Sequence, residues 1–162
     1  MGKTLKNINL LFLIVSVVTL GLFISCDDEG CIESVIAYPI GSLKAMGEDA
    51  PTIKSYSVWG VGQEKDSVLL SNQTSLKGIE LLLNPNEEFT DFKFRFVVGT
   101  DTIIDYIKFS YKNRLYFLSI DCGCSTFYSI ESIENGGAFI KDTEIVNSDV
   151  TNEKKVNFNL YY

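Results

Sequence analysis

Four cysteines carry the most reactive side chains of this 162-residue chain: Cys26, Cys31, Cys122 and Cys124. The segment SIDCGCSTF places Cys122 and Cys124 two residues apart, so on a strand both side chains would point to the same face. A Cys-Gly-Cys pair does redox chemistry only where nearby cations or a helix N-terminus lower the thiol pKa. Asp121 is the immediate neighbour and would raise that pKa, which disfavours redox work.

The sequence contains no histidine, which removes the Ser-His-Asp and Cys-His nucleophile arrangements and the commonest general base. Glycoside hydrolysis needs only two carboxylates, and four lie on or beside expected strands: Glu80, Asp91, Asp105 and Asp121. Strand carboxylates usually lie on the solvent face, so we expect no catalytic residue. Without histidine or finger-type cysteine spacing, we also expect no metal site and no cofactor.

The first 25 residues have the features of a targeting segment. Lys3 and Lys6 are the only charges before Cys26, and residues 10–24 form an apolar run. A membrane-spanning helix needs about 20 apolar residues, so this run is short for one. We predict a signal peptide at residues 1–25.

The residues LFIS followed by Cys26 resemble the lipobox of bacterial lipoproteins. This resemblance implies that Cys26 becomes the mature N-terminus and carries acyl chains, such as palmitate, that attach the protein to a membrane. The acidic residues 27–29 resemble the surface-export signal of Bacteroidota lipoproteins; the alternative is a solvated tether that ends in the periplasm. We therefore expect a lipid-anchored protein of the bacterial outer membrane, on its periplasmic face or at the cell surface.

The mature chain is long enough for one domain with a sizeable core. We expect an acidic, lipidated tether at residues 26–33 and a single domain at residues 34–162. Since residues 1–25 hold two lysines and no acid, the mature part has 12 basic and 21 acidic residues, a net charge of −9. Nucleic acids would be repelled, so none is expected as a partner.

Aromatic and β-branched residues, with turn residues every ten or so positions, predict an antiparallel β-sandwich of seven to nine strands, with an open β-barrel as the alternative. In TDFKFRFVV, the alternation puts Phe92, Phe94, Phe96 and Val98 on one face. A turn at 99–101 leads to a strand at 102–111, and KN at 112 and 113 turns again into a strand at 114–120. These three strands are expected to form a meander.

Other strands are predicted along the chain, and residues 131–137 are turn-rich. The C-terminal segment KKVNFNLYY predicts a closing strand that is tied into a sheet. It has Val156, Phe158, Leu160 and Tyr162 on one side, with Asn157 and Asn159 on the other. The earlier predicted strands cover residues 34–40, 54–61, 67–70 and 77–83.

With Cys26 lipidated, three cysteines remain in an oxidising compartment, and they cannot all pair within one chain. We prefer a bridge between Cys31 and Cys122, which closes a loop of about 90 residues and contributes about 4 kcal/mol. The alternative bridge joins Cys31 to Cys124. The cysteine left over is expected to be a buried, small hydrophobic residue.

A longer resemblance covers most of the mature chain. Its features, in order, are a cysteine soon after the lipid cysteine, VWGVG, LLLNPNEEFTDFKF, DTIIDYIKFSYKNRLYFLSIDCG and DTEIVNSDV. Together they resemble a family of small Bacteroidota lipoproteins classed as a domain of unknown function. In that pattern the cysteine of the CG pair corresponds to Cys122, which favours it as the partner of Cys31. The resemblance implies a lineage and a compartment but no activity.

We expect a non-enzymatic binding, assembly or structural module of the envelope. Its partners would be the membrane, through the lipid anchor, and an envelope protein, a host protein or a glycan. One alternative is a thiol-dependent or hydrolytic enzyme; another is an inhibitor of a basic host enzyme such as lysozyme, because opposite charge speeds association. The candidate stacking platforms are Trp59, Tyr106, Tyr111, Tyr116, Tyr128, Tyr161 and Tyr162.

Overall fold

The computed structural model describes residues 36–62 and 65–162, which belong to the compact unit Cys31–Tyr162. The predicted signal peptide, the predicted tether, Cys26 and Cys31 lie outside these residues. Within the described part, no helix is long and apolar enough to cross a membrane.

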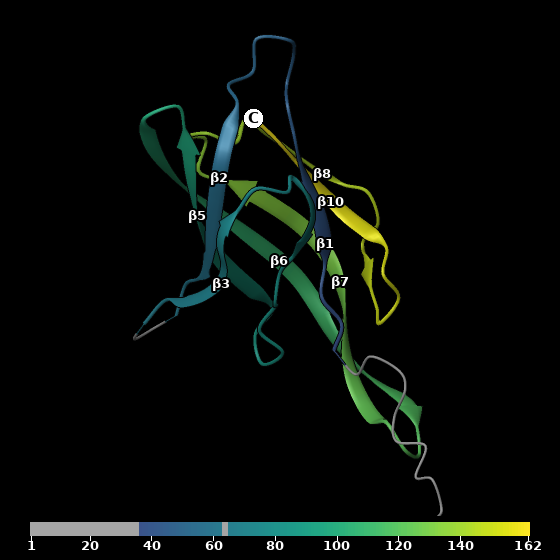
Figure 1. Ribbon diagram of the computed structural model, residues 1–162. Coiled ribbons are helices and arrows are strands. Elements are labelled where there is room, and N and C mark those ends of the chain that lie inside the picture. Colours follow the sequence, from purple (N-terminus) through teal and green to yellow (C-terminus); the bar gives the residue numbers. More distant parts are fainter. Residues whose placement is uncertain (1–35, 63–64) are drawn as a thin grey trace, which may run out of the picture. The chain divides into compact units, whose positions relative to one another are not determined.

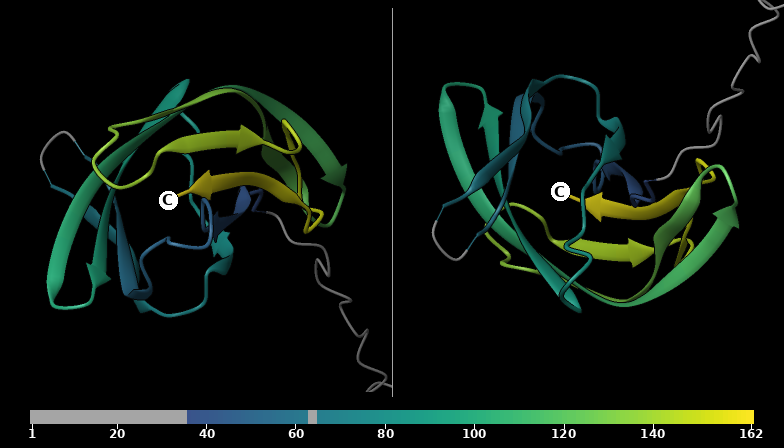
Figure 2. Two further views of the ribbon diagram at one scale, coloured as in Figure 1. Left: turned by 90° about the horizontal axis from the view of Figure 1, so that it is seen from above. Right: turned by 90° about the horizontal axis from the view of Figure 1, so that it is seen from below.

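The described residues form two β-sheets (Figure 1). The larger sheet has the strand order β3 (Ser67–Gln73), β2 (Ile53–Gly60), β5 (Phe89–Val98), β6 (Asp101–Ser119), β7 (Gly123–Asn135), β9 (Asp149–Val150). The smaller sheet has the order β4 (Lys77–Glu80), β1 (Ile40–Lys44), β10 (Val156–Tyr161), β8 (Asp142–Ile145). The larger sheet curves over the smaller one (Figure 2). The expected all-β, sandwich-like fold is confirmed.

Phenylalanine rings fill the space between the sheets. Phe92, Phe94 and Phe96 of β5 are fully buried, which confirms the face predicted from their alternation. Phe109 of β6 meets Phe158 of β10 edge to face, with ring centroids 5.0 Å apart, so these two rings join the two sheets. Burying each such ring contributes about 1.5–3 kcal/mol, and edge-to-face pairs add to that.

The C-terminal strand is tied into the smaller sheet, as predicted, where β10 runs parallel to β1. The predicted faces of β10 are partly wrong, because Val156 is 46% exposed whereas Asn157 and Asn159 are buried. Both asparagines are tolerated inside because their side chains are hydrogen-bonded: the amide of Asn157 donates to backbone carbonyls, and that of Asn159 donates to Glu144.

The turn predicted at residues 112 and 113 is wrong, because β6 runs without interruption from Asp101 to Ser119. Lys112 and Asn113 pair with Ser129 and Tyr128 of β7, so both remain in the ladder. The chain reverses instead at residues 120–122. Strand β7 likewise continues to Asn135, through most of the segment predicted as turn-rich. A meander of three consecutive antiparallel strands, β5, β6 and β7, does form, with its first turn between Val98 and Asp101 as predicted, but its second turn lies later in the chain and its third strand is β7.

Strand β1 begins later than predicted, and strand β4 ends earlier than predicted. Strand β1 begins at Ile40, and residues 36–39 are not in a strand, which agrees with the missing N–H of Pro39. Strand β4 ends at Glu80, although Leu81 and Leu83 beyond it are buried in the core. Burial of these leucines explains why the pattern looked like a longer strand.

Candidate functional site

A groove of about 440 Å³ lies between the β6–β7 hairpin and the segment of residues 147–155. Its volume falls in the usual range of small-molecule sites. Two aromatic residues and seven hydrogen-bonding residues line it: Tyr116, Phe127, Arg114, Asn147, Asp149, Thr151, Asn152, Glu153 and Lys155. We call this the polar groove.

The hairpin supplies the aromatic side of the polar groove. Arg114 and Tyr116 are two residues apart on β6, so both side chains point to the same face. Phe127 lies opposite Arg114 in the ladder, and its ring stacks under that of Tyr116, with centroids 4.7 Å apart and planes 12° apart. Phe127 is buried, while Tyr116 is 50% exposed. Tyr116 is therefore an aromatic platform held in place by the ring beneath it.

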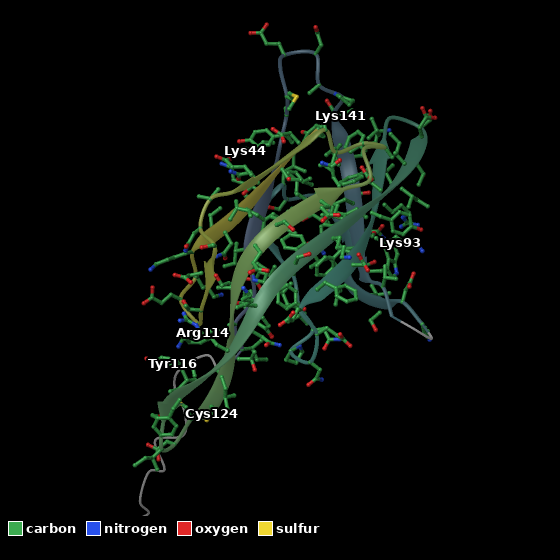
Figure 3. The ribbon with its side chains drawn as sticks, turned by 180° about the vertical axis from the view of Figure 1, so that it is seen from behind. Lys44, Lys93, Arg114, Tyr116, Cys124 and Lys141 are labelled. Atoms are coloured by element: carbon green, nitrogen blue, oxygen red, sulfur yellow. The ribbon has the colours of Figure 1, made fainter. Side chains whose placement is uncertain are left out.

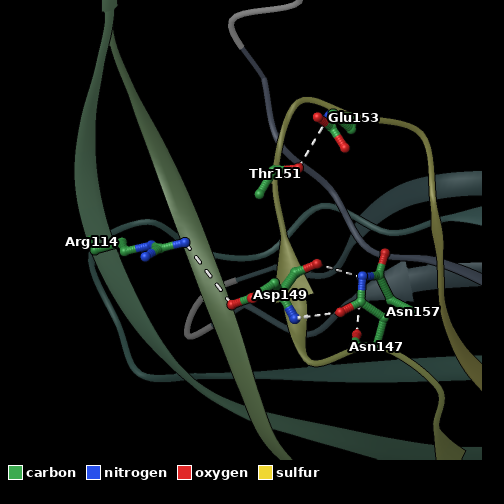
Figure 4. Close-up of polar contacts among 6 residues, drawn as sticks. All are labelled: Arg114, Asn147, Asp149, Thr151, Glu153 and Asn157. Carbon is green, nitrogen blue, oxygen red and sulfur yellow. Dashed lines mark hydrogen bonds and ion pairs between the residues drawn. The ribbon is translucent and has the colours of Figure 1, made fainter.

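The loop side of the polar groove is fixed by the buried Asn157 (Figure 4). Its amide nitrogen donates to the carbonyl oxygens of Asn147 and Asp149, at 3.0 and 2.9 Å. Its amide oxygen accepts from the backbone N–H of Ile40, at 3.1 Å, so one side chain links β10, β1 and the loop. Further along the loop, the hydroxyl of Thr151 accepts from the backbone N–H of Glu153. The loop therefore presents its polar side chains from a defined backbone.

The charges of the polar groove balance one another. Arg114 faces Asp149 across the groove, with 3.9 Å between the nearest nitrogen and oxygen, and both side chains are exposed. Lys155 pairs with Glu153. The hydrogen bond from Lys155 lowers the pKa of Glu153, and the same bond raises the pKa of Lys155. Two cations and two anions leave no net charge, so the lining favours a neutral, hydrogen-bonding ligand.

The two described cysteines do not share a strand face. Cys122 lies in the turn of the hairpin, where its N–H donates to the hydroxyl of Ser119, and Cys124 begins the regular part of β7 after Gly123. Gly123 has a φ of 70°, which a residue with a side chain rarely adopts. Cys124 is free and exposed, whereas the leftover cysteine was expected to be buried. Cys122 does not carry a free thiol.

The four candidate carboxylates lie on different elements: Glu80 in β4, Asp91 in β5, Asp105 in β6 and Asp121 in the turn between β6 and β7. Asp105 is only 1% exposed, so the expectation of a solvent-facing side chain is wrong for it. Its carboxylate accepts from the backbone N–H groups of Phe139 and Ile140, both at 2.8 Å, which makes it a structural acceptor. Glu80 and Asp121 are exposed. Among the described residues, no cluster of three acidic or cysteine side chains could hold a metal ion.

Of the predicted stacking platforms, Tyr116 is the one that lines the polar groove. Tyr111 and Tyr128 are buried and contact each other in the core. Tyr106 is 55% exposed but does not line the groove. The groove residues between Asn147 and Lys155 were not predicted as part of a site. Their polar side chains are visible in the sequence, but they lie far from Tyr116 along the chain, so nothing in the sequence connects the two.

A sequence model of a protein family, described as "Family of unknown function (DUF6452)", matches residues 55–162. That match includes both the hairpin and the loop that form the polar groove. No curated protein and no solved structure matches the chain.

Proposed function

This chain belongs to the DUF6452 family, a family of unknown function, and we propose that it is a non-enzymatic binding module anchored by lipid at Cys26. Its polar groove would hold a carbohydrate chain of the envelope. The proposed location is the bacterial outer membrane, on the periplasmic face or at the cell surface. The support for the anchor is the apolar run of residues 10–24, followed at once by Cys26.

The observation that carries the binding proposal is the exposed Tyr116 ring, beside hydrogen-bonding side chains of zero net charge. A sugar ring has apolar C–H faces and several hydroxyl groups, so it needs a flat apolar surface together with donors and acceptors. Tyr116 offers the surface. Arg114, Asn147 and Asn152 offer donors, and Asp149 offers an acceptor. A nucleotide or another polyanion would gain little from a lining without net charge.

We further propose that Cys31 pairs with Cys122, which would fix the start of the domain to the turn of the hairpin. The support is that Cys124 is free while Cys122 is not a free thiol, and the described residues contain no other cysteine. A bridge that closes a loop of about 90 residues stabilises the fold by about 4 kcal/mol in the chain-entropy model.

The binding proposal is tested by calorimetric titration of the purified protein with chitotetraose, cellohexaose and maltohexaose. We expect one of these neutral oligosaccharides to bind, and Tyr116→Ala to abolish that binding. Tyr106→Ala is the matched control, since Tyr106 lies on the same strand with similar exposure but outside the groove. The proposal is wrong if none of the three sugars binds, or if Tyr116→Ala binds as the wild type does.

A further inference from the structure

The far end of the β6–β7 hairpin exposes apolar side chains. Leu115 is 74% exposed, Phe117 is 59% exposed and Ile120 is 91% exposed. We call Leu115, Phe117 and Ile120 the apolar tip; the segment of residues 115–120 that carries them contains no charged residue. The hairpin extends past the other strands at one end of the domain (Figure 1). Three large, exposed apolar side chains within six residues indicate a contact surface, whereas single exposed apolar residues need no explanation.

The apolar tip is separate from the polar groove. Leu115 and Phe117 alternate with Tyr116 along β6, so they point to the opposite face of the hairpin. Across the ladder they lie opposite Thr126 and Cys124 of β7. Figure 3 places Arg114, Tyr116 and Cys124 at this end of the molecule, with Lys44 and Lys141 at the other. A ligand in the groove would therefore leave the apolar tip uncovered.

We propose that the apolar tip enters the lipid surface to which Cys26 is attached. This inference rests on the proposed function, because it takes the lipid anchor and the Cys31–Cys122 bridge as given. Cys26 and Cys31 are five residues apart, which an extended chain covers in about 18 Å at most. Cys122 is two residues from Ile120. A disulfide adds about 6 Å between its two Cα atoms, and the chain from Cys122 to Ile120 adds about 7 Å at most, so the bridge would hold Ile120 within about 30 Å of the lipid anchor.

A lipid surface fits the apolar tip better than a protein partner does. Side chains that enter the interface reach about 5–10 Å into the boundary between headgroups and acyl chains, a depth that the apolar side chains of a narrow hairpin can occupy. Asp121 and the acidic residues 27–29 would stay in the headgroup water, which limits the depth.

The experiment uses the free thiol of Cys124, which lies opposite Phe117 in the ladder. The lipidated protein is labelled there with a nitroxide and reconstituted into phosphatidylethanolamine–phosphatidylcholine vesicles. Flotation reports the anchor, and accessibility of the nitroxide to oxygen and to a water-soluble nickel chelate reports depth. A label at Glu48→Cys, combined with Cys124→Ser, gives the reference at the loop between β1 and β2. Figure 1 shows that loop at the opposite end from the hairpin.

We expect the protein to float, and the label at Cys124 to lose most of its contact with nickel while it gains contact with oxygen. The label at residue 48 should stay fully accessible to nickel. Ile120→Ser with Phe117→Ser should restore nickel contact at Cys124 without affecting flotation. Val68→Ser is the matched control, since Val68 is 61% exposed on β3, and it should change neither reading.

Three results would overturn the inference. Protein that fails to float contradicts the anchor, and the inference fails with it. Protein that floats with a water-accessible label at Cys124 leaves the anchor intact and contradicts the lipid contact alone. A label shielded from both oxygen and nickel means that a second copy or another protein covers the apolar tip instead of lipid.

Discussion

Replacing Asp105 by alanine removes the acceptor that holds the segment after β7 against β6. Asp105 is buried, and one of its oxygens accepts from the N–H groups of both Phe139 and Ile140. Each buried N–H left without an acceptor costs about 1–3 kcal/mol. The loss for the two amides is therefore about 2–6 kcal/mol, a large part of the 5–15 kcal/mol that stabilises a typical domain.

Asp105→Asn is the informative companion variant. An asparagine keeps one carbonyl oxygen, which can still accept from both Phe139 and Ile140. It gives up only the bond from the N–H of Tyr106 to the other carboxylate oxygen, which is 2.9 Å long. We therefore expect a cost of about 1 kcal/mol for asparagine. If the alanine variant does not fold, the asparagine variant still measures what the bond to Tyr106 and the negative charge of Asp105 contribute.

The assay is urea unfolding followed by circular dichroism. With a slope of about 2 kcal/mol per molar urea, the alanine variant should unfold at about 1–3 M less urea than the wild type. Asp101→Ala is the matched control, because Asp101 is exposed on the same strand, and its effect should stay within about 0.5 kcal/mol. An Asp105→Ala midpoint equal to that of Asp101→Ala would mean that the two hydrogen bonds to Asp105 do not stabilise the fold.

Three further predictions concern other parts of the fold. Gly41→Ala should lower the free energy of unfolding by about 1–3 kcal/mol, because a Cβ there would overlap the buried ring of Phe158. Glu144→Gln should reduce stability at pH 7, where the carboxylate accepts from the hydroxyl of Tyr161. That bond lowers the pKa of Glu144 from 4.5, so the difference from the wild type should fade as the pH drops below about 4.5. Cys122→Ser should cost about 4 kcal/mol if the proposed bridge forms.

Each of these has a direct check by urea or thermal unfolding. Gly41→Ala with unchanged stability would mean that Phe158 can move aside. A Glu144→Gln difference that grows in acid would contradict the lowered pKa, since a lowered pKa stabilises the fold only while the carboxylate is ionised. A wild-type melting temperature that does not change on reduction would argue against the Cys122 bridge.

Local patterns predicted the strands that bury one face, and they failed where polar residues lie inside. Phe92, Phe94 and Phe96 were assigned correctly because each alternate position is apolar. Asp105 occupies an inward position between Ile103 and Ile107, and the N–H groups that donate to its carboxylate come from residues 139 and 140, far along the chain. Alternation could therefore place Asp105 on the inner face. A buried carboxylate is stable there because the folded chain brings two backbone N–H groups to it, and local sequence does not predict those donors.

The polar groove could be predicted only in part, for the same reason. Tyr116 was named as a stacking platform from its residue type. Asp149 and Asn147 line the same groove, and their backbone carbonyls accept from the buried side chain of Asn157, a contact between separate segments that local alternation does not predict. The hairpin itself was misread, since KN at 112 and 113 is a common turn signal that here continues in the ladder. Pairing with β7 overrides that signal.

The lipid anchor and the bridge are both tested by the intact mass of the protein purified from membranes, alkylated before and after reduction. A lipid-anchored module predicts a chain that begins at Cys26 and carries acyl chains. It should have one alkylated thiol, at Cys124, before reduction and two more, at Cys31 and Cys122, after it. An unlipidated chain would contradict the anchor, and alkylation of both Cys122 and Cys124 without reduction would contradict the bridge.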